Sequence, residues 1–212
     1  MSDELRARLE LTGTELAALA DRLRRLIGLA VTSEAPGHRL EAATQKLDEA
    51  IALLVPHEPA GPTPRFPAGD RSRPDEVMPF DPLMGRLNPL APPMRFTWEP
   101  PRAIGTVAFE TPYEGPPGCV HGGVIAAAFD QVFNVANLLS GRPGPTVRLA
   151  LRFRRPTPIR TPLRFEGWQE RADERRVHTL GRLLVDERVT VEAEGSFALL
   201  STDAVMRLGR RD

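Results

Sequence analysis

The feature that most constrains the fold is an almost continuous apolar stretch from His121 to Leu139. It contains no proline, while Gly141 and Pro143 follow it closely, a pattern typical of a helix end. Apolar side chains spread around nearly the whole circumference of this predicted helix: Val124, Ile125, Phe129, Val132, Phe133, Val135, Leu138 and Leu139. Such a helix is buried on most sides, so we expect other elements to cover it.

Period-two alternation of apolar and polar residues predicts strands around this helix. The alternation is strictest over 146–153, where four apolar residues share one face and arginines lie on the other. Further alternating runs lie at 104–110, 163–170, 177–185 and 188–200. One long helix among several such runs predicts an α+β fold, in which an antiparallel sheet is covered on one face by a single central helix.

The first part of the chain has a helical pattern instead. Apolar residues at alternating spacings of four and three, a heptad-like pattern, predict a helix over about 3–30. After a break at Ala35-Pro36-Gly37, a matching stripe over 40–54 predicts a second helix. We expect a helical hairpin whose apolar stripes pack on each other, on the core or on a second chain.

Dense prolines separate this hairpin from the remainder of the chain. From Pro56 to Pro101 the apolar periodicity lapses, which predicts a linker that is extended at first and then lies along the following domain. The predicted organisation is a helical hairpin over 1–55, a proline-rich linker over 56–79, a sheet-and-helix domain over 80–205 and a C-terminal tail over 206–212.

A stripe of three polar residues interrupts the apolar surface of the central helix. Asp130, Asn134 and Asn137 recur at i, i+4 and i+7, so they form one narrow stripe. A carboxylate among apolar side chains is costly unless a partner stabilises it or its pKa rises, and both conditions are enriched at functional sites. Asp130 is therefore a candidate catalytic acid. The alternative is a solvated or hydrogen-bonded residue without a catalytic role.

The start of the same helix is a candidate anion site. His121-Gly122-Gly123 places free N–H groups and the positive end of the helix dipole where a ligand can approach the backbone closely. Gly122 and Asp130 are eight residues apart, which is roughly 12 Å along a helix axis. Groups that act on one carbonyl lie within about 3 Å of the reacting atoms. We therefore expect a composite site, with the amide from one copy of the chain and the carboxylate from another.

Composition and charge narrow the classes of partner. The chain has 28 basic and 28 acidic residues, so its zero net charge gives no support for binding nucleic acid or an acidic membrane. No apolar run approaches the roughly 20 residues that cross a bilayer, and the first residues lack the apolar core of a signal peptide. The single cysteine, Cys119, permits no internal disulfide. We expect a cytoplasmic protein.

Other site signatures are absent from the sequence. His38, His57 and His178 do not cluster with acids at metal-ligand spacing, so we predict no metal. The sequence also has no phosphate-binding GxxxxGK loop, no GxSxG nucleophile motif and no dinucleotide fingerprint.

The residues around the helix start resemble a known family. His121-Gly122-Gly123, the nine-residue spacing from His121 to Asp130 and the preceding Glu114-Gly115-Pro116-Pro117-Gly118 are similar to the hotdog-fold acyl-CoA thioesterases. Within these, they resemble the PaaI-like branch of the 4-hydroxybenzoyl-CoA thioesterase-like superfamily. The resemblance covers roughly residues 80–205. It implies a homodimer or dimer of dimers that hydrolyses an acyl-CoA to a free acid and coenzyme A, with no cofactor besides the coenzyme A of the substrate.

The resemblance also implies roles for individual residues. Asp130 matches the general base or nucleophile, and the Gly122 N–H matches the group that polarises the thioester carbonyl. Thr146 falls where this branch often has a Ser or Thr that orients the water or the acid. Asn134 matches a position that contacts substrate, and His121 is expected to position the glycines.

Further residues are candidates for binding the substrate. Gly123 belongs to the glycine pair that a ligand can approach closely. Arg154 and Arg155 follow the 146–153 strand, and their guanidinium groups suit the phosphates of coenzyme A. The alternative for these arginines is a solvated strand face.

Two alternative functions stay open. An acyl-CoA hydratase of the same fold typically has an Asp five residues before the histidine, where this chain has Pro116, so we disfavour it. Many relatives carry Asn or Gln at the position of Gly115, and its absence removes one polar contact to the carbonyl or the acid. The second alternative is therefore a catalytically silent acyl-CoA or fatty-acid binding protein, whose helical hairpin mediates oligomerisation or recruits a partner.

Overall fold

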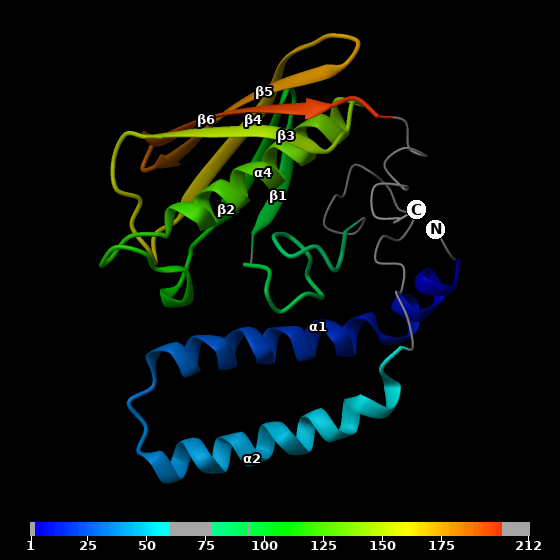
Figure 1. Ribbon diagram of the computed structural model, residues 1–212, viewed down its shortest axis with the longest axis vertical. Helices are drawn as coiled ribbons and strands as arrows, with labels where there is room; N and C mark the ends of the chain where they lie inside the picture. The colour runs from blue at the N-terminus through cyan, green and yellow to red at the C-terminus, as the bar shows by residue number, and fades with distance from the viewer. Residues whose placement is uncertain (1–2, 60–77, 93, 201–212) are drawn as a thin grey trace.

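The computed structural model describes residues 3–59, 78–92 and 94–200. They form an N-terminal pair of helices and a unit of one long helix and one sheet (Figure 1). In chain order the elements are α1 (Asp3–Thr32), α2 (Gly37–Leu54), the 3-10 helix η1 (Val55–His57), β1 (Arg95–Glu99), β2 (Arg102–Val107), the 3-10 helix η2 (Thr111–Tyr113), α4 (Gly122–Leu139), β3 (Thr146–Phe153), β4 (Leu163–Ala172), β5 (Arg176–Val185) and β6 (Arg188–Ala198).

The six strands form one antiparallel sheet in the order β1-β2-β4-β5-β6-β3. The helix α4 lies across one face of this sheet and packs mainly on β2, β4 and β5. The predicted α+β hotdog fold, an antiparallel sheet wrapped around a long central helix, is confirmed. Although β3 follows α4 directly in sequence, it is an edge strand, and this position matters for the site.

Aromatic rings fill the space between α4 and the sheet. Phe129 and Phe133 of α4 make edge-on contacts with Phe165 and Phe197, and all four rings are fully buried. Three glycines on neighbouring strands lie beneath Phe133. A Cβ atom built at Gly167, Gly181 or Gly195 would lie 3.0, 2.5 or 2.8 Å from a Phe133 ring carbon. Glycine at these positions therefore lets the helix approach the sheet closely.

Among the described residues, α4 is the one helix long and apolar enough to cross a membrane, so the expectation that no apolar run approaches this length is wrong. These two properties are weak support for a membrane span, because a buried core helix has them equally. The buried residues of α4 include Ile125, Phe129 and Val132, which belong to the main apolar core. Packing in this core accounts for the composition of the helix.

The strands differ from the sequence prediction at several of their ends, and one strand was not predicted. The sequence pattern predicts no strand at 95–99, but β1 pairs there with β2; the prolines on both sides obscured a short alternation. The strand predicted over 104–110 occupies Arg102–Val107, because the chain turns into η2, whose Pro112 has no N–H for a ladder. The last strand ends at Ala198 instead of 200.

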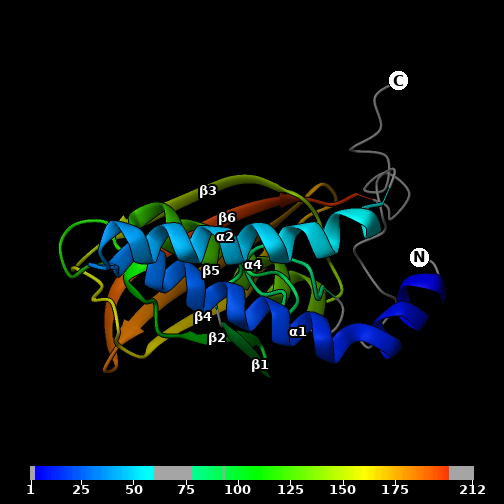
Figure 2. The same cartoon turned by 90° about the horizontal axis from the view of Figure 1, so that it is seen from below.

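Both predicted N-terminal helices are present. Figure 1 shows α1 between α2 and the sheet-and-helix unit, and Figure 2 shows the two helices from below. Ala20 on α1 is 1 % exposed, so α1 packs on the rest of the chain. By contrast, α2 has no buried residue. The predicted apolar stripe of α1 thus faces the rest of the chain in part, whereas that of α2 is exposed in the single chain.

The predicted domain boundaries fall partly outside the described residues. Positions 60–77 of the predicted linker, 201–205 of the predicted domain and the whole 206–212 tail lie outside them. The described residues 78–92 form an irregular segment, here the 78–92 loop, which packs on the sheet-and-helix unit. Its buried residues are Pro79, Met84, Gly85, Ala91 and Pro92.

Candidate active site

The N-terminus of α4 presents one backbone N–H to a ligand. His121 is the N-cap residue, and its Nδ1 accepts a hydrogen bond from the Gly123 N–H at 3.0 Å. The His121 carbonyl accepts from Val124 and Ile125 at 3.0 and 3.2 Å. Within the described part of the chain, the Gly122 N–H has no acceptor. The Gly122 N–H, the predicted oxyanion donor, is therefore available to a ligand. The Gly123 N–H is not, because it donates to His121 Nδ1.

A tight loop before α4 fixes the position of His121. The Gly115 N–H donates to the Cys119 carbonyl at 2.9 Å, and the His121 N–H donates to the Tyr113 carbonyl at 2.9 Å. A Cβ atom at Gly115 would lie 2.8 Å from His121 Cα, which is too close for any side chain. The loop therefore requires glycine at the position where many relatives of the resembled family have Asn or Gln.

Asp130 lies half-buried at the middle of α4, where two side chains hold it. Thr146 Oγ1 donates to Asp130 Oδ1 at 2.5 Å, and Asn134 Nδ2 donates to Asp130 Oδ2 at 3.3 Å. The structure therefore brings together three of the predicted site residues. The roles assigned to them by resemblance stay predictions.

Asn137, the third member of the predicted polar stripe, has a different environment. It is fully buried against the sheet, where its Oδ1 accepts from Thr179 Oγ1 at 2.7 Å. Its Nδ2 has no hydrogen-bond partner among the described residues. Asn137 therefore contributes to the core and does not reach Asp130 in the way Asn134 does.

The strand β3 touches both halves of the candidate site. Its first residue, Thr146, bonds to Asp130. Its last residue, Phe153, lies against the helix start, because a Cβ atom at Gly122 would be 3.3 Å from Phe153 Cζ. Within one chain the two halves are separated by about two turns of helix, roughly 12 Å.

The 78–92 loop contributes a second carboxylate that the sequence prediction missed. Asp81 Oδ1 accepts from the N–H groups of Leu83 and Met84 at 2.8 and 3.1 Å. Burial raises the pKa of Asp81 and the charge of Asp130 raises it further, while these two backbone hydrogen bonds oppose the increase. Asp81 therefore lies within electrostatic reach of Asp130. An Asp-Pro pair is a turn signal in the sequence, but it does not show which helix the turn packs on.

The two arginines predicted to bind phosphate bond to their own chain. Arg154 donates from Nε and Nη2 to Glu192 Oε2 at 3.0 and 2.6 Å, and Arg155 donates from Nη1 to the Val189 carbonyl at 2.9 Å. Both arginines are exposed. Their predicted contact with coenzyme A stays a prediction, and it requires them to leave or share these partners.

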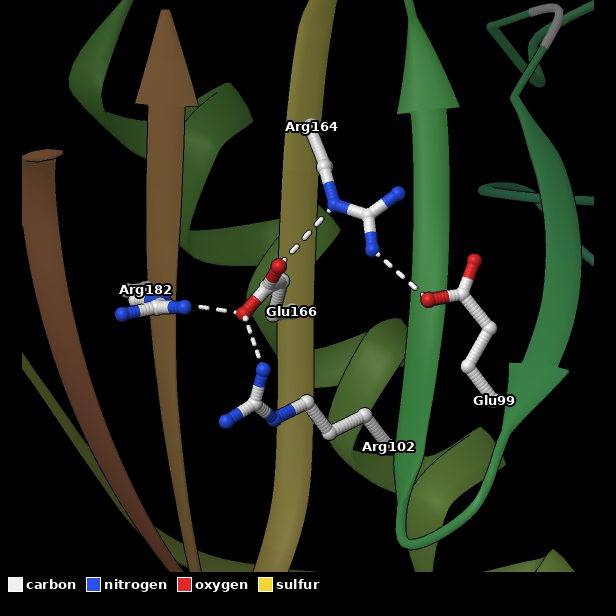
Figure 3. A network of polar contacts seen from close by, with 5 residues as sticks. All are labelled: Glu99, Arg102, Arg164, Glu166 and Arg182. Carbon is white, nitrogen blue, oxygen red and sulfur yellow. Dashed lines mark hydrogen bonds and ion pairs between the residues drawn. The ribbon is translucent and has the colours of Figure 1, made fainter. Parts of the chain in front are cut away.

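The outer face of the sheet carries an ion-pair network around Glu166 (Figure 3). Arg164 and Arg182 donate to its two carboxylate oxygens at 2.9 and 2.8 Å, and Arg102 lies 3.5 Å away. Burial alone would raise the pKa of Glu166, but these guanidinium groups outweigh it and hold the pKa below its ordinary value. The network stabilises the face of the sheet opposite to α4.

Among the described residues, no group of three or more His, Cys, Asp or Glu side chains is arranged to hold a metal ion. The predicted absence of a metal or other cofactor stays a prediction.

Comparisons with known proteins give one family. The family model described as Thioesterase superfamily matches residues 117–192. Among solved structures, protein RHA08564, a thioesterase superfamily protein, is 34% identical to this chain, with a TM-score of 0.77. The alignment covers 86% of this chain and 94% of that one. The comparison with curated proteins found no match.

More distant solved structures align with half of this chain. A hypothetical thioesterase protein with coenzyme A, from Streptococcus pneumoniae, is 15% identical, with 50% of this chain and 87% of that chain covered and a TM-score of 0.47. A mutant of the phenylacetic acid degradation protein PaaI from Thermus thermophilus is 16% identical, with 50% and 93% covered and a TM-score of 0.46.

Proposed function

Because the chain belongs to the thioesterase superfamily, we propose that it hydrolyses an acyl-CoA thioester to a free acid and coenzyme A. The observation that carries this proposal is the position of β3: Thr146 at one end holds Asp130, and Phe153 at the other end lies on Gly122. Hydrolysis of a thioester needs a carboxylate that acts as a general base and a hydrogen-bond donor for the developing oxyanion.

Gly122 supplies the oxyanion half of the site. Its N–H is unpaired within the described chain and points from the positive end of the α4 dipole. A thioester oxygen placed there accepts this hydrogen bond, which strengthens as negative charge develops on the oxygen. His121 caps the helix through Gly123 and so keeps the Gly122 N–H in place. In this proposal His121 and Gly123 position the donor and line the binding site.

Asp130 supplies the basic half. It removes a proton from a water molecule as the water oxygen bonds to the carbonyl carbon, and the carbonyl electron pair moves to the oxygen held by Gly122. When this tetrahedral oxyanion collapses, the C–S bond breaks and the proton passes from Asp130 to the departing sulfur. Thr146 and Asn134 orient the carboxylate for both transfers. Direct attack of Asp130 on the carbonyl carbon is the alternative route to the same products.

The two halves meet across a dimer interface in this proposal. β3 is an edge strand, and its Val147 and Phe153 side chains are 51% and 54% exposed. An exposed edge strand is a template for pairing with a second chain. Antiparallel pairing of two β3 strands about their centre places Thr146 of one copy opposite Phe153 of the other. Asp130 of the first copy then approaches Gly122 of the second, in a homodimer or a dimer of dimers.

The alternative is a catalytically silent acyl-CoA binding protein, and Gly115 is the observation that favours it. The loop has no room for a side chain at this position, so the polar contact that many relatives supply there is absent. The Gly122 N–H is a backbone donor, so it stays available to the thioester oxygen whatever residue stands at 115. Because this donor and Asp130 are both present, we favour hydrolysis over silent binding.

Release of free thiol from a panel of acyl-CoAs tests the proposal. We expect turnover by the wild type and none by Asp130→Asn, while Asp173→Asn, an exposed turn carboxylate, retains the wild-type rate. Saturable binding of acyl-CoA without any thiol release would establish the silent alternative instead.

Subunit mixing tests the composite site separately. Gly122→Pro removes the N–H at the first helical position, where proline is tolerated. A mixture of Gly122→Pro and Asp130→Asn subunits forms heterodimers with one intact site each, so we expect about a quarter of the wild-type rate from random pairing in a symmetric dimer. A mixture as inactive as its components would contradict the shared site.

A further inference from the structure

Arg24, in the C-terminal half of α1, binds an irregular loop far away in the sequence. Its side chain is 17% exposed. Its Nε donates to the Ala91 carbonyl at 3.0 Å. Its Nη2 lies within hydrogen-bond distance of three further carbonyls, those of Asn88, Arg86 and Gly85, at 2.8, 2.9 and 3.3 Å. One guanidinium therefore gathers four backbone carbonyls of the 78–92 loop.

These contacts join the loop to another part of the chain. Turns within the segment bond several of its own N–H groups, and Arg24 supplies a donor from outside the segment to four of its carbonyls. Hydrogen bonds from a charged donor are roughly twice as strong as neutral ones. Asp21 accepts from Arg24 Nη1 at 2.6 Å and orients the guanidinium from α1 itself. Arg24 thus fixes the loop to the N-terminal helix.

The same loop contacts the helix beside the candidate acid. Met84 is buried and packs with Val135 and Ala136 of α4. The Gln131 side chain, next to Asp130 in sequence, donates from Nε2 to Met84 Sδ. Gly85 is the next residue after Met84, and its carbonyl is one of the four held by Arg24.

At its other end the loop contacts the oxyanion half. Tyr113 OH donates to the Leu90 carbonyl at 3.4 Å, and the Tyr113 carbonyl accepts from the His121 N–H at 2.9 Å. His121 is the cap that leaves the Gly122 N–H free. The four carbonyls held by Arg24 follow Met84 in the chain and lie on both sides of Leu90. Arg24 therefore holds the part of the loop that joins these two contacts.

We propose that Arg24 is a positioning residue for the reaction: by holding the 78–92 loop, it keeps Met84 packed on α4 beside Asp130 and keeps Tyr113 in place under the His121 cap that leaves the Gly122 N–H free. The proposal rests on the proposed hydrolysis of acyl-CoA. It gives the N-terminal helix α1 a role in the site, although none of its residues is placed among the reacting groups. An arginine suits this role, because its planar group has five donors where a lysine has a single ammonium.

The test compares Arg24→Ala and Arg24→Lys with Arg22→Ala, an exposed arginine on the same helix, in the full-length protein. Hydrogen exchange of the 78–92 backbone amides, the melting temperature, kcat and KM are measured for each. For Arg24→Ala we expect loop exchange to rise on the order of 10-fold. Since misplacement of reacting groups by about 1 Å can cost 100-fold, we expect kcat to fall on the order of 10- to 100-fold, with KM changed less. Arg24→Lys should be intermediate, and Arg22→Ala should match the wild type.

The outcomes separate the two proposals. A loop that stays protected in Arg24→Ala, or a loosened loop with unchanged kcat, overturns the role of Arg24. If Arg24→Ala does not fold, Arg24→Lys carries the same comparison. If the wild type releases no thiol from any acyl-CoA, the proposal of hydrolysis fails. Hydrogen exchange of the loop then tests the Arg24 contact by itself, and unchanged protection in Arg24→Ala overturns the proposal that Arg24 holds the loop.

Discussion

The Thr146 hydroxyl donates a hydrogen bond to the Asp130 carboxylate, sixteen positions earlier in the sequence, with 2.5 Å between the two oxygens. The bond joins the central helix to the edge strand that a second copy of the chain would pair with. It therefore links the candidate acid to the edge strand at which we propose that two copies of the chain form the composite site.

The first prediction concerns this bond. Thr146→Val keeps the shape of the side chain and removes the donor, so the Asp130 carboxylate loses one of its two side-chain partners. We expect kcat for acyl-CoA hydrolysis to fall on the order of 10- to 100-fold, because orientation of the base is lost. Thr161→Val, which removes a hydroxyl bonded to the Ile159 carbonyl, is the matched control and should retain the wild-type kcat. Equal rates for the two variants would show that Thr146 does not orient the acid.

The second prediction concerns the loop before α4. Gly115→Asn restores the residue type of many relatives, but its Cβ would lie 2.8 Å from His121 Cα. We expect a loss of stability of about 1–3 kcal/mol from this overpacking, together with lower activity. Gly118→Asn is the control in the same loop, because that position is open and its φ of +75° is one that Asn tolerates. Urea unfolding and thiol release measure the two effects; a more active Gly115→Asn protein would contradict the prediction.

The third prediction concerns the pH dependence of stability at Glu166. Its pKa in the folded chain is below the ordinary value of 4.5. The contribution of Glu166 to stability is therefore complete above pH 4.5 and is lost as the pH falls through the lower folded pKa. Glu166→Gln leaves Arg102, Arg164 and Arg182 facing one another, so we expect a loss of about 1–3 kcal/mol at pH 7.

This loss should become smaller in acid, where the wild type also loses the Glu166 charge. Urea unfolding at pH 7 and near pH 3 checks the difference. Glu170→Gln on the same strand, where the side chain is exposed, serves as the control and should change little at either pH. A penalty for Glu166→Gln that is independent of pH would exclude the ion pairs as its cause.

The fourth prediction concerns Asp81, whose contribution to stability changes with pH in the direction opposite to that of Glu166. The pKa of Asp81 in the folded chain is above its ordinary value of 3.8, first because the carboxyl is buried. The folded chain then binds more protons than the unfolded chain, so the contribution of Asp81 to stability falls as the pH rises from 3.8 through the folded pKa. Asn cannot lose a proton, so Asp81→Asn should be more favourable relative to the wild type at pH 7 than near pH 3.

Asp173→Asn is the matched comparison for Asp81. Asp173 also accepts hydrogen bonds from the N–H groups two and three residues later, but it is exposed and its pKa is lowered by these bonds. Its substitution should therefore be less favourable at pH 7 than near pH 3. Unfolding curves at both pH values decide the matter, and the same trend for both variants would contradict the effect of burial at Asp81.

The sequence by itself predicts the elements whose residues repeat with a regular period. α4 and β3 occur where the pattern places them, and His121 caps the helix at the predicted glycine pair. β1 is the exception, because five alternating residues between prolines are too short a signal. Periodicity succeeds because it reports which face of an element is buried, and this is a local property of the chain.

Only the tertiary structure decides which elements meet. The position of β3 at the sheet edge brings Thr146 to Asp130 and Phe153 to Gly122, although nothing local in the sequence specifies this pairing. The contacts of Arg24 with a loop more than 60 residues away leave no period in the sequence either. A guanidinium binds backbone carbonyls, which every residue has. The path of the folded chain therefore determines which carbonyls Arg24 binds, and residue type does not.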